Sequence, residues 1–216
     1  LNEYIDNYKY AKLTNQYTSR ITDFIKEKNA SELTFNAWYQ NLKTTKTILS
    51  GRSDIEVFYW IDGLGVEWIP LIKKCIEQKQ SEGVYLNEIY VARSLYPTTT
   101  ENNKKALMEL SGNNLIKCGD LDSHAHQNTN EFPTYILEEI EIVNKALEKI
   151  FSEYNGKKIA IISDHGLTAL TQLCEGLNMA GVESDHHGRL AYRKIGNCVS
   201  SSDYILCNDD KTMCAL

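Results

Sequence analysis

The sequence predicts an α/β fold with a mainly parallel central sheet flanked by helices. Four segments with strand character alternate with helical segments, and a strand followed by a helix is the repeating unit of a parallel sheet. In addition, the polar residues of greatest chemical interest lie at or just after the predicted strand ends. Ligands of open α/β sheets bind at that edge of the sheet.

Residues 1–50 are polar and rich in Tyr, Lys, Asn and Thr, and their apolar positions recur at roughly helical spacing. We expect two or three helices here, as a lead-in segment to a domain that spans residues 51–216. A chain of 216 residues is long enough for one well-buried domain with such an appendage. Because the chain begins at Leu1 instead of methionine, we expect it to be a piece of a longer protein.

The first predicted strand is a continuous apolar run, EVFYWI, that ends in Asp62 and glycines. Such a run is typical of a strand buried on both faces, and the next stretch, 66–79, has its apolar residues on one helical face. A long amphipathic helix is expected after Pro133, with apolar residues at steps of three and four. The four predicted strand segments are 56–65, 85–93, 114–122 and 157–166.

Composition excludes several classes of protein. The formal net charge is −6 and the pI is about 5.4, which argues against a broad nucleic-acid-binding surface. No window approaches the roughly 18 apolar residues of a membrane span, so we expect no membrane association. The six cysteines form no CxxC pair, which argues against zinc-ribbon and thioredoxin folds and favours reduced thiols in a cytoplasmic protein.

Acidic residues and histidines follow the predicted strands. Asp164 and His165 stand side by side at a strand end, where both side chains can reach one metal ion; the alternative is a polar turn that caps a helix. Taken alone, Asp62 is more typical of an ordinary Asp-Gly turn after a buried strand. Asp122 and His126 are four residues apart and would share a helical face. Asp120 and His124 have the same spacing, so the register stays open.

Two further segments supply hydroxyl and cationic groups. Thr99 and Thr100 follow a proline just past a predicted strand, and a threonine needs a metal ion to lower its pKa before it can act as a nucleophile. Taken alone, this segment is more typical of a turn rich in hydroxyl side chains. The late His186, His187 and Arg189 offer nitrogen ligands and a guanidinium that can bind phosphate, or form a basic surface loop.

The ordered set of motifs resembles the metal-site signature of the alkaline phosphatase superfamily. Within that group, SDHGLTAL followed by HHGRLAYR looks most like the PglZ domain of bacterial phage-defence systems of the BREX type, and LDSHAHQ is similar to its Asp-x-x-x-His element. The resemblance covers roughly residues 55–193. It implies a three-layer sandwich with an alkaline-phosphatase-like core.

The resemblance also implies two metal sites, with Zn²⁺ as the first expectation and Mn²⁺ or Mg²⁺ as alternatives. Thr100 is preferred to Thr99 as nucleophile, Asp122 to Asp120, and His187 to His186. Arg189 and Asn103 are candidates for binding the phosphoryl oxygens. The implied ligands of the first metal are Asp62, Thr100, Asp164 and His165, and those of the second are Asp122, His126 and His187.

By this resemblance, the chain is expected to be a phosphatase or phosphodiesterase that uses two divalent metals. Its partners would be a phosphate ester, which includes nucleotides and nucleic acids, and other proteins of the defence system. A catalytically silent PglZ-like scaffold that assembles a defence complex is the alternative. The two hypotheses differ in a simple test, because only the enzyme should hydrolyse a generic phosphate ester when it is supplied with metal.

Overall fold

The structure is a computed structural model, and the residues it describes form two compact units. The described residues are 2–30, 34–111, 114–127, 130–167, 173, 179–185, 190–199, 204–207 and 211–215. One unit comprises Leu1–Leu42, Leu95–Pro97 and Thr168–Leu216, and the other comprises Lys43–Ser94 and Thr98–Leu167. This division follows spatial proximity, whereas the segments 1–50 and 51–216 were inferred from composition and motifs, so they stay a prediction.

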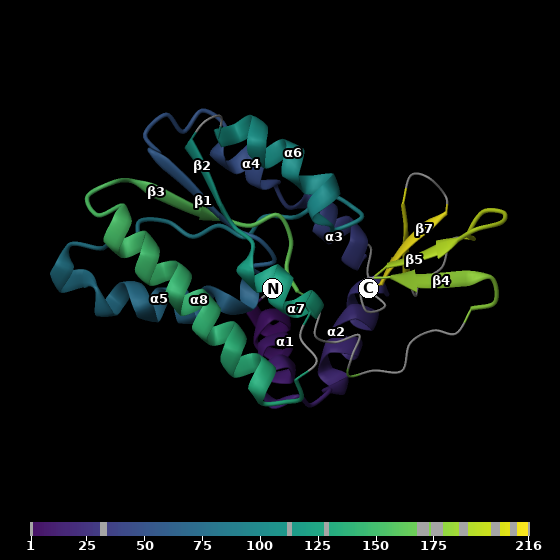
Figure 1. Cartoon of the computed structure of the whole chain (residues 1–216). Coiled ribbons are helices and arrows are strands. Elements are labelled where there is room, and N and C mark those ends of the chain that lie inside the picture. The colour runs from purple at the N-terminus through teal and green to yellow at the C-terminus, as the bar shows by residue number, and fades with distance from the viewer. Residues whose placement is uncertain are drawn as a thin grey trace. The chain divides into compact units, whose positions relative to one another are not determined.

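The second unit is built on a parallel three-stranded sheet. Strand β1 (Val57–Ile61) lies in the centre, between β2 (Leu115–Cys118) and β3 (Ile159–Ile162) (Figure 1). Tyr59 is in register with Ile116 on one side and with Ile161 on the other. The mixed α/β class and three of the four predicted strands are therefore confirmed.

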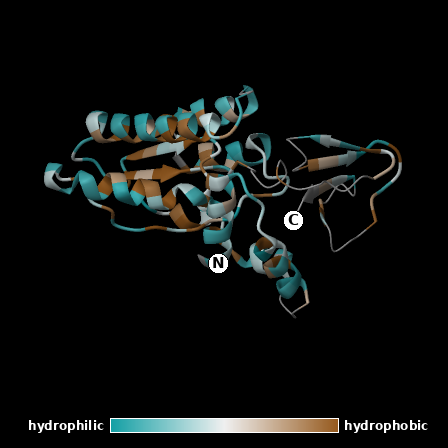
Figure 2. Ribbon diagram, turned by 90° about the horizontal axis from the view of Figure 1, so that it is seen from below, coloured by the Kyte–Doolittle hydropathy of each residue, from teal (hydrophilic) through white to brown (hydrophobic). Residues whose placement is uncertain are grey.

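Helices cover both faces of this sheet. Successive side chains of a strand point to opposite faces, and all five residues of β1 are buried. Tyr59 and Ile61 pack into a cluster with residues of α5 (Ile69–Gln78) and α8 (Thr134–Glu153). Phe58 and Trp60 pack instead with residues of α6 (Thr100–Ser111) and α4 (Thr45–Leu49). Figure 2 shows the apolar residues gathered on the sheet and on the inner faces of the helices beside it. Shorter elements complete the unit: η1 (Val66–Trp68), η2 (Gln80–Glu82) and α7 (Asp120–Gln127).

Helix α8 confirms the amphipathic helix expected after Pro133. Ile136, Val143 and Leu147 form part of its buried stripe, while its other faces carry exposed charged side chains such as Glu141 and Lys145. An apolar stripe with charged residues on the remaining faces is typical of a helix that packs on the core with one side and is exposed to solvent on the other. Within the described ranges, no helix is both long and apolar enough to cross a membrane.

The strand predicted over 85–93 is wrong. These residues form no strand in the structure, and their one bridge joins Arg93 to Thr44. Aromatic and β-branched side chains favour a strand when they can pack against a pleated surface. Here Tyr85, Ile89 and Tyr90 are exposed, so that packing is missing.

The first unit combines helices with a second sheet that the sequence did not predict. Its helices are α1 (Asn2–Thr14), α2 (Ser19–Asn29) and α3 (Phe35–Asn41). With α4, the described part of residues 1–50 carries four helices where two or three were expected. Thr18 caps α2 by accepting from the Arg20 N–H, and Ile21 and Phe24 lie on its buried face. The sheet is antiparallel, in the order β4 (Val182–Asp185), β5 (Leu190–Arg193), β7 (Thr212–Ala215) and β6 (Tyr204–Leu206).

Candidate metal centre

The parallel sheet brings acidic side chains together at one edge. Asp62 follows β1, Asp164 and His165 follow β3, and Asp122 lies in the first turn of α7, which begins just after β2. The carboxyl ends of parallel strands meet at the same edge, so residues far apart in the sequence converge there. Asp62 and Asp164 are each 3% exposed and His165 is 6% exposed, and ionisable groups are almost never buried to this degree unless they are paired.

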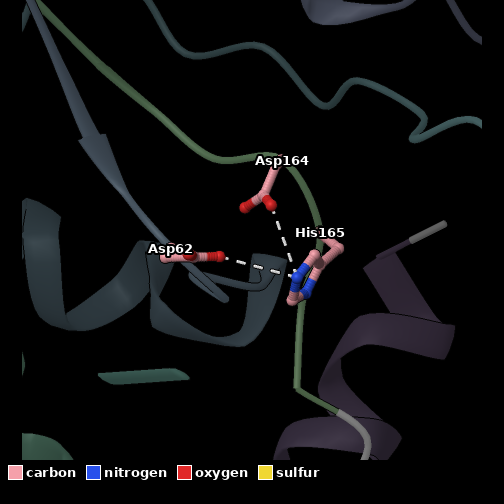
Figure 3. A group of neighbouring side chains, drawn as sticks. All are labelled: Asp62, Asp164 and His165. Carbon is pink, nitrogen blue, oxygen red and sulfur yellow. Dashed lines mark ion pairs between the residues drawn. The ribbon is translucent and has the colours of Figure 1, made fainter. Parts of the chain in front are cut away.

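Three side chains form a compact cluster of donors. One ligand atom each from Asp62, Asp164 and His165 lies within 4.8 Å of the others. Figure 3 shows both carboxylates pointing toward the same side of the imidazole, with His165 Nε2 3.5 Å from Asp62 Oδ1 and 3.4 Å from Asp164 Oδ2. These separations are too long for direct hydrogen bonds of good geometry, and they leave the three atoms facing a common point.

The orientation of the His165 ring directs Nε2 at the two carboxylates. His165 Nδ1 is 3.2 Å from the carbonyl oxygen of Gly166, and a carbonyl can only accept, so Nδ1 is the donor in this contact and Nε2 is the ring nitrogen that faces the carboxylates. Asp164 Oδ2 is buried and finds no hydrogen-bond donor among the described residues. Two carboxylate oxygens and an imidazole nitrogen that converge in a buried place suit a cation, so the residues present fit a divalent metal.

Each carboxylate has its second oxygen held from outside the cluster. The indole Nε1 of Trp60 donates to Asp164 Oδ1 at 3.0 Å, and Lys117 Nζ forms an ion pair with Asp62 Oδ2 at 2.6 Å. The sequence did not point to either residue, because Trp60 belongs to an apolar run and Lys117 lies inside a predicted strand. The strand register, which places these two residues side by side, would have been needed to find them.

Thr100 reaches the same cluster from the first turn of α6. Its Oγ1 is 3.0 Å from Asp62 Oδ1, to which it donates, and 3.0 Å from His165 Nε2. The neighbouring Thr99 contacts its own helix: its Oγ1 accepts from Asn102 at 3.2 Å and its carbonyl oxygen accepts from the Asn103 amide at 2.9 Å. Of the two candidate nucleophiles, Thr100 is therefore the one that contacts the cluster.

Asp122 and His126 lie next to the cluster. Asp122 Oδ1 is 3.5 Å from His126 Nε2 and 4.0 Å from His165 Nε2, and it is buried with no hydrogen-bond donor in the described part of the chain. The alternative pair behaves differently, because Asp120 is exposed and His124 forms an ion pair with Glu138 at 3.4 Å. The remaining candidates, His186, His187 and Arg189, lie outside the described residues.

The donor set limits what the cluster can bind. Carboxylate oxygens combined with an imidazole nitrogen suit Zn²⁺ or Mn²⁺. The Thr100 hydroxyl, which lies within hydrogen-bonding distance of Asp62 and His165, adds a third kind of ligand. No family model matches the chain, and no curated protein or solved structure is significantly similar to it. The chemistry of the cluster is therefore read from its own side chains.

Because Asp164 is buried, the stability of the metal-free protein should depend on pH. Burial raises the pKa of Asp164 above its ordinary range, and the carboxylate of Asp62 acts in the same direction, while the nearby His165 opposes it. The folded chain thus keeps this proton at a pH where the unfolded chain, with an ordinary pKa of about 3.9, has lost it.

In chelator, the free energy of unfolding should therefore fall as pH rises above about 4, until the raised pKa is passed. Urea titrations of the wild type and Asp164→Asn across this range measure the effect, because the difference between the two isolates this group. A difference that stays constant with pH would contradict the raised pKa.

Gly166 packs closely against the backbone of Gly65, so adding a single methyl group at Gly166 should destabilise the protein. A Cβ added to Gly166 would lie 3.0 Å from the Cα of Gly65, and a backbone atom cannot move aside as a flexible side chain can. We expect Gly166→Ala to lower the free energy of unfolding by about 1–3 kcal/mol. Gly119→Ala is the matched control, since its Cβ would meet Lys117 Cε at an ordinary 4.0 Å. Equal stability of the two variants in urea would contradict this packing.

Proposed function

We propose that the chain is a metal-dependent phosphohydrolase, a phosphatase or phosphodiesterase, with Thr100 as its nucleophile. The observation that carries the proposal is the position of the Thr100 hydroxyl, 3.0 Å from two donors of a buried carboxylate–imidazole cluster. A threonine hydroxyl is a poor nucleophile at neutral pH, so a metal site directly beside it gives it a means of activation.

Two divalent ions would be held at this edge of the sheet. Asp62, Thr100, Asp164 and His165 would bind the first, and Asp122, His126 and His187 the second. Zn²⁺ is the first candidate for both, with Mn²⁺ and Mg²⁺ as alternatives. When bound, such ions lower the pKa of a coordinated hydroxyl and neutralise the charge that develops on phosphoryl oxygens.

The residues of the chain would supply the nucleophile and the group that accepts its proton. Thr100 Oγ1 would form a bond to phosphorus while the bond from phosphorus to the leaving oxygen breaks. The Thr100 hydroxyl donates to Asp62 Oδ1 at 3.0 Å, so this carboxylate would take the hydroxyl proton as the bond to phosphorus forms. Water would then hydrolyse the phosphothreonine and return a proton to Oγ1. Arg189 and Asn103 stay candidates for holding the phosphoryl oxygens.

The wider assignment rests on the motifs. Their order along the chain, from Asp62 through the Ser163-Asp164-His165-Gly166 segment to the late histidines, resembles a PglZ domain and supports an alkaline-phosphatase-like core. On this basis we propose a role in bacterial phage defence, with a phosphate ester such as a nucleotide or nucleic acid as substrate. Other defence proteins would be its partners in the cytoplasm.

Metal content and hydrolysis, measured together, test the proposal. The chain, purified without chelator, is analysed for transition metals and assayed on a generic phosphomonoester and a phosphodiester with added Zn²⁺, Mn²⁺ or Mg²⁺. Close to two ions per chain and turnover that chelator abolishes are expected. Bound metal without turnover on either ester would favour the scaffold, and a chain that takes up no metal at all would overturn the metal centre itself.

A further inference from the structure

The two carboxylates of the cluster are held so that one particular oxygen of each faces His165. Asp164 presents Oδ2 to His165 Nε2 at 3.4 Å, and Asp62 presents Oδ1 at 3.5 Å. A carboxylate can turn about its last bond and offer either oxygen, so a fixed choice requires a partner on the other oxygen. The structure contains such a partner for each of them.

The partner of Asp164 is an indole. Trp60 Nε1 donates to Asp164 Oδ1 at 3.0 Å, and the backbone N–H of Gly63 lies 3.5 Å from the same oxygen. Trp60 is 3% exposed and sits on the central strand β1, where neighbours on both sides fix its backbone. The N–H is therefore presented from a strand that is paired along both of its edges.

The ring of Trp60 is in turn held in place by the residue that binds Asp62. Lys117 is in register with Trp60 on the adjacent strand β2, and its Nζ lies 4.3 Å from the centroid of the Trp60 ring. The same Nζ is 2.6 Å from Asp62 Oδ2. An ammonium group stacked on an indole is attracted to its face, so the two side chains constrain each other. Both carboxylates are thus oriented by one pair of neighbouring side chains.

We infer that Trp60 is a positioning residue for the metal centre, whose indole N–H holds Oδ1 of Asp164 so that Oδ2 is presented to the metal. The inference rests on the proposed metal site. A ligating carboxylate that is hydrogen-bonded from outside loses less freedom on binding the ion, and loss of such an outer partner typically weakens metal binding by about 10- to 100-fold. Trp60 touches neither the nucleophile Thr100 nor its proton in this scheme, so its effect should be on metal affinity.

Trp60→Phe tests the inference, because phenylalanine keeps an aromatic ring but has no N–H. Affinity for Zn²⁺ is measured by competition with a chromophoric chelator, and it should be about 10- to 100-fold weaker than in the wild type. Trp68→Phe is the matched control: Trp68 is also a buried tryptophan, but it belongs to the hydrophobic cluster on the opposite face of the sheet. This control should bind Zn²⁺ as the wild type does. Equal affinity of Trp60→Phe and the wild type would overturn the positioning role.

A second measurement needs no substitution at Trp60. The chain has three tryptophans, at 38, 60 and 68, so the indole N–H signal of Trp60 can be assigned by elimination in Trp38→Phe and Trp68→Phe. On titration of the wild type with Zn²⁺ this signal should shift, because its acceptor becomes a metal ligand. A Trp60 signal that stays in place while Zn²⁺ binds would refute the inference even if Trp60→Phe failed to fold.

The two proposals fail in different ways. If the wild type binds no metal, the metal centre is wrong and the role of Trp60 falls with it. If the wild type binds metal and hydrolyses esters while Trp60→Phe does both equally well, only the positioning role is wrong.

Discussion

Replacing Asp164 with asparagine should strip the first metal from the chain and abolish hydrolysis, yet stabilise the protein in the presence of chelator. The first effect follows from charge, because the substitution removes one of the two carboxylates of the cluster, the other being Asp62. The loss in affinity should exceed the roughly 10- to 100-fold typical of losing an outer partner. Turnover should fall by at least about 10²- to 10³-fold, as when a group that stabilises transition-state charge is removed.

The second effect follows from hydrogen bonding. In the wild type, Asp164 Oδ2 is a buried acceptor that finds no donor among the described residues, and it lies 3.4 Å from His165 Nε2. An asparagine Nδ2 at that place would donate to Nε2, while its Oδ1 would still accept from Trp60. The gain of one buried hydrogen bond is worth about 1 kcal/mol. Stability and metal binding thus oppose each other at this residue, as is common at functional sites.

Elemental analysis and urea unfolding in chelator measure the two effects on the same preparations. Asp164→Ala should also lose the metal, but without the gain in stability, because it can donate no hydrogen bond. Asp120→Asn serves as the control, since this carboxylate is exposed and should change neither property. If Asp164→Asn kept wild-type metal content and turnover, the metal-centre scheme would have to be abandoned.

The sequence predicted the parts of the fold that depend on long apolar patterns. β1 is a continuous apolar run because both of its faces are covered by helices, and α8 repeats its apolar residues at the helical period. Strands β4 to β7 form an antiparallel sheet, so the alternation of strand and helix that identified β2 and β3 does not extend to them. Residues 85–93 show the opposite error, because strand-like composition without a surface to pack on forms no strand.

The same distinction applies to the candidate site. Asp62, Asp164 and His165 were found because a parallel sheet collects its strand ends at one edge, so position in the sequence implied position in space. Trp60 and Lys117 could not be found in this way, because their contact depends on the register of β1 against β2. Register and side-chain direction also decide which of two adjacent threonines reaches the cluster, and neither can be read from spacing alone.

Replacing Thr100 with alanine should abolish turnover while leaving most of the metal in place. The hydroxyl is the proposed nucleophile, whereas the charge that would hold the ion comes from Asp62 and Asp164. Removal of a nucleophile usually lowers kcat by about 10³-fold or more. Thr100→Ser keeps the hydroxyl and should retain much of the activity, because serine offers the same oxygen at the same position.

Thr99→Ala is the matched control for this substitution, because it removes a neighbouring threonine whose hydroxyl accepts from Asn102 within its own helix. Turnover of a generic phosphate ester, metal content and thermal stability should be measured for all three variants. Should Thr100→Ala hydrolyse the ester as fast as Thr99→Ala, Thr100 would not be the nucleophile. A metal-activated water would then be the next candidate for the nucleophile, and the site would act as a one-step hydrolase instead.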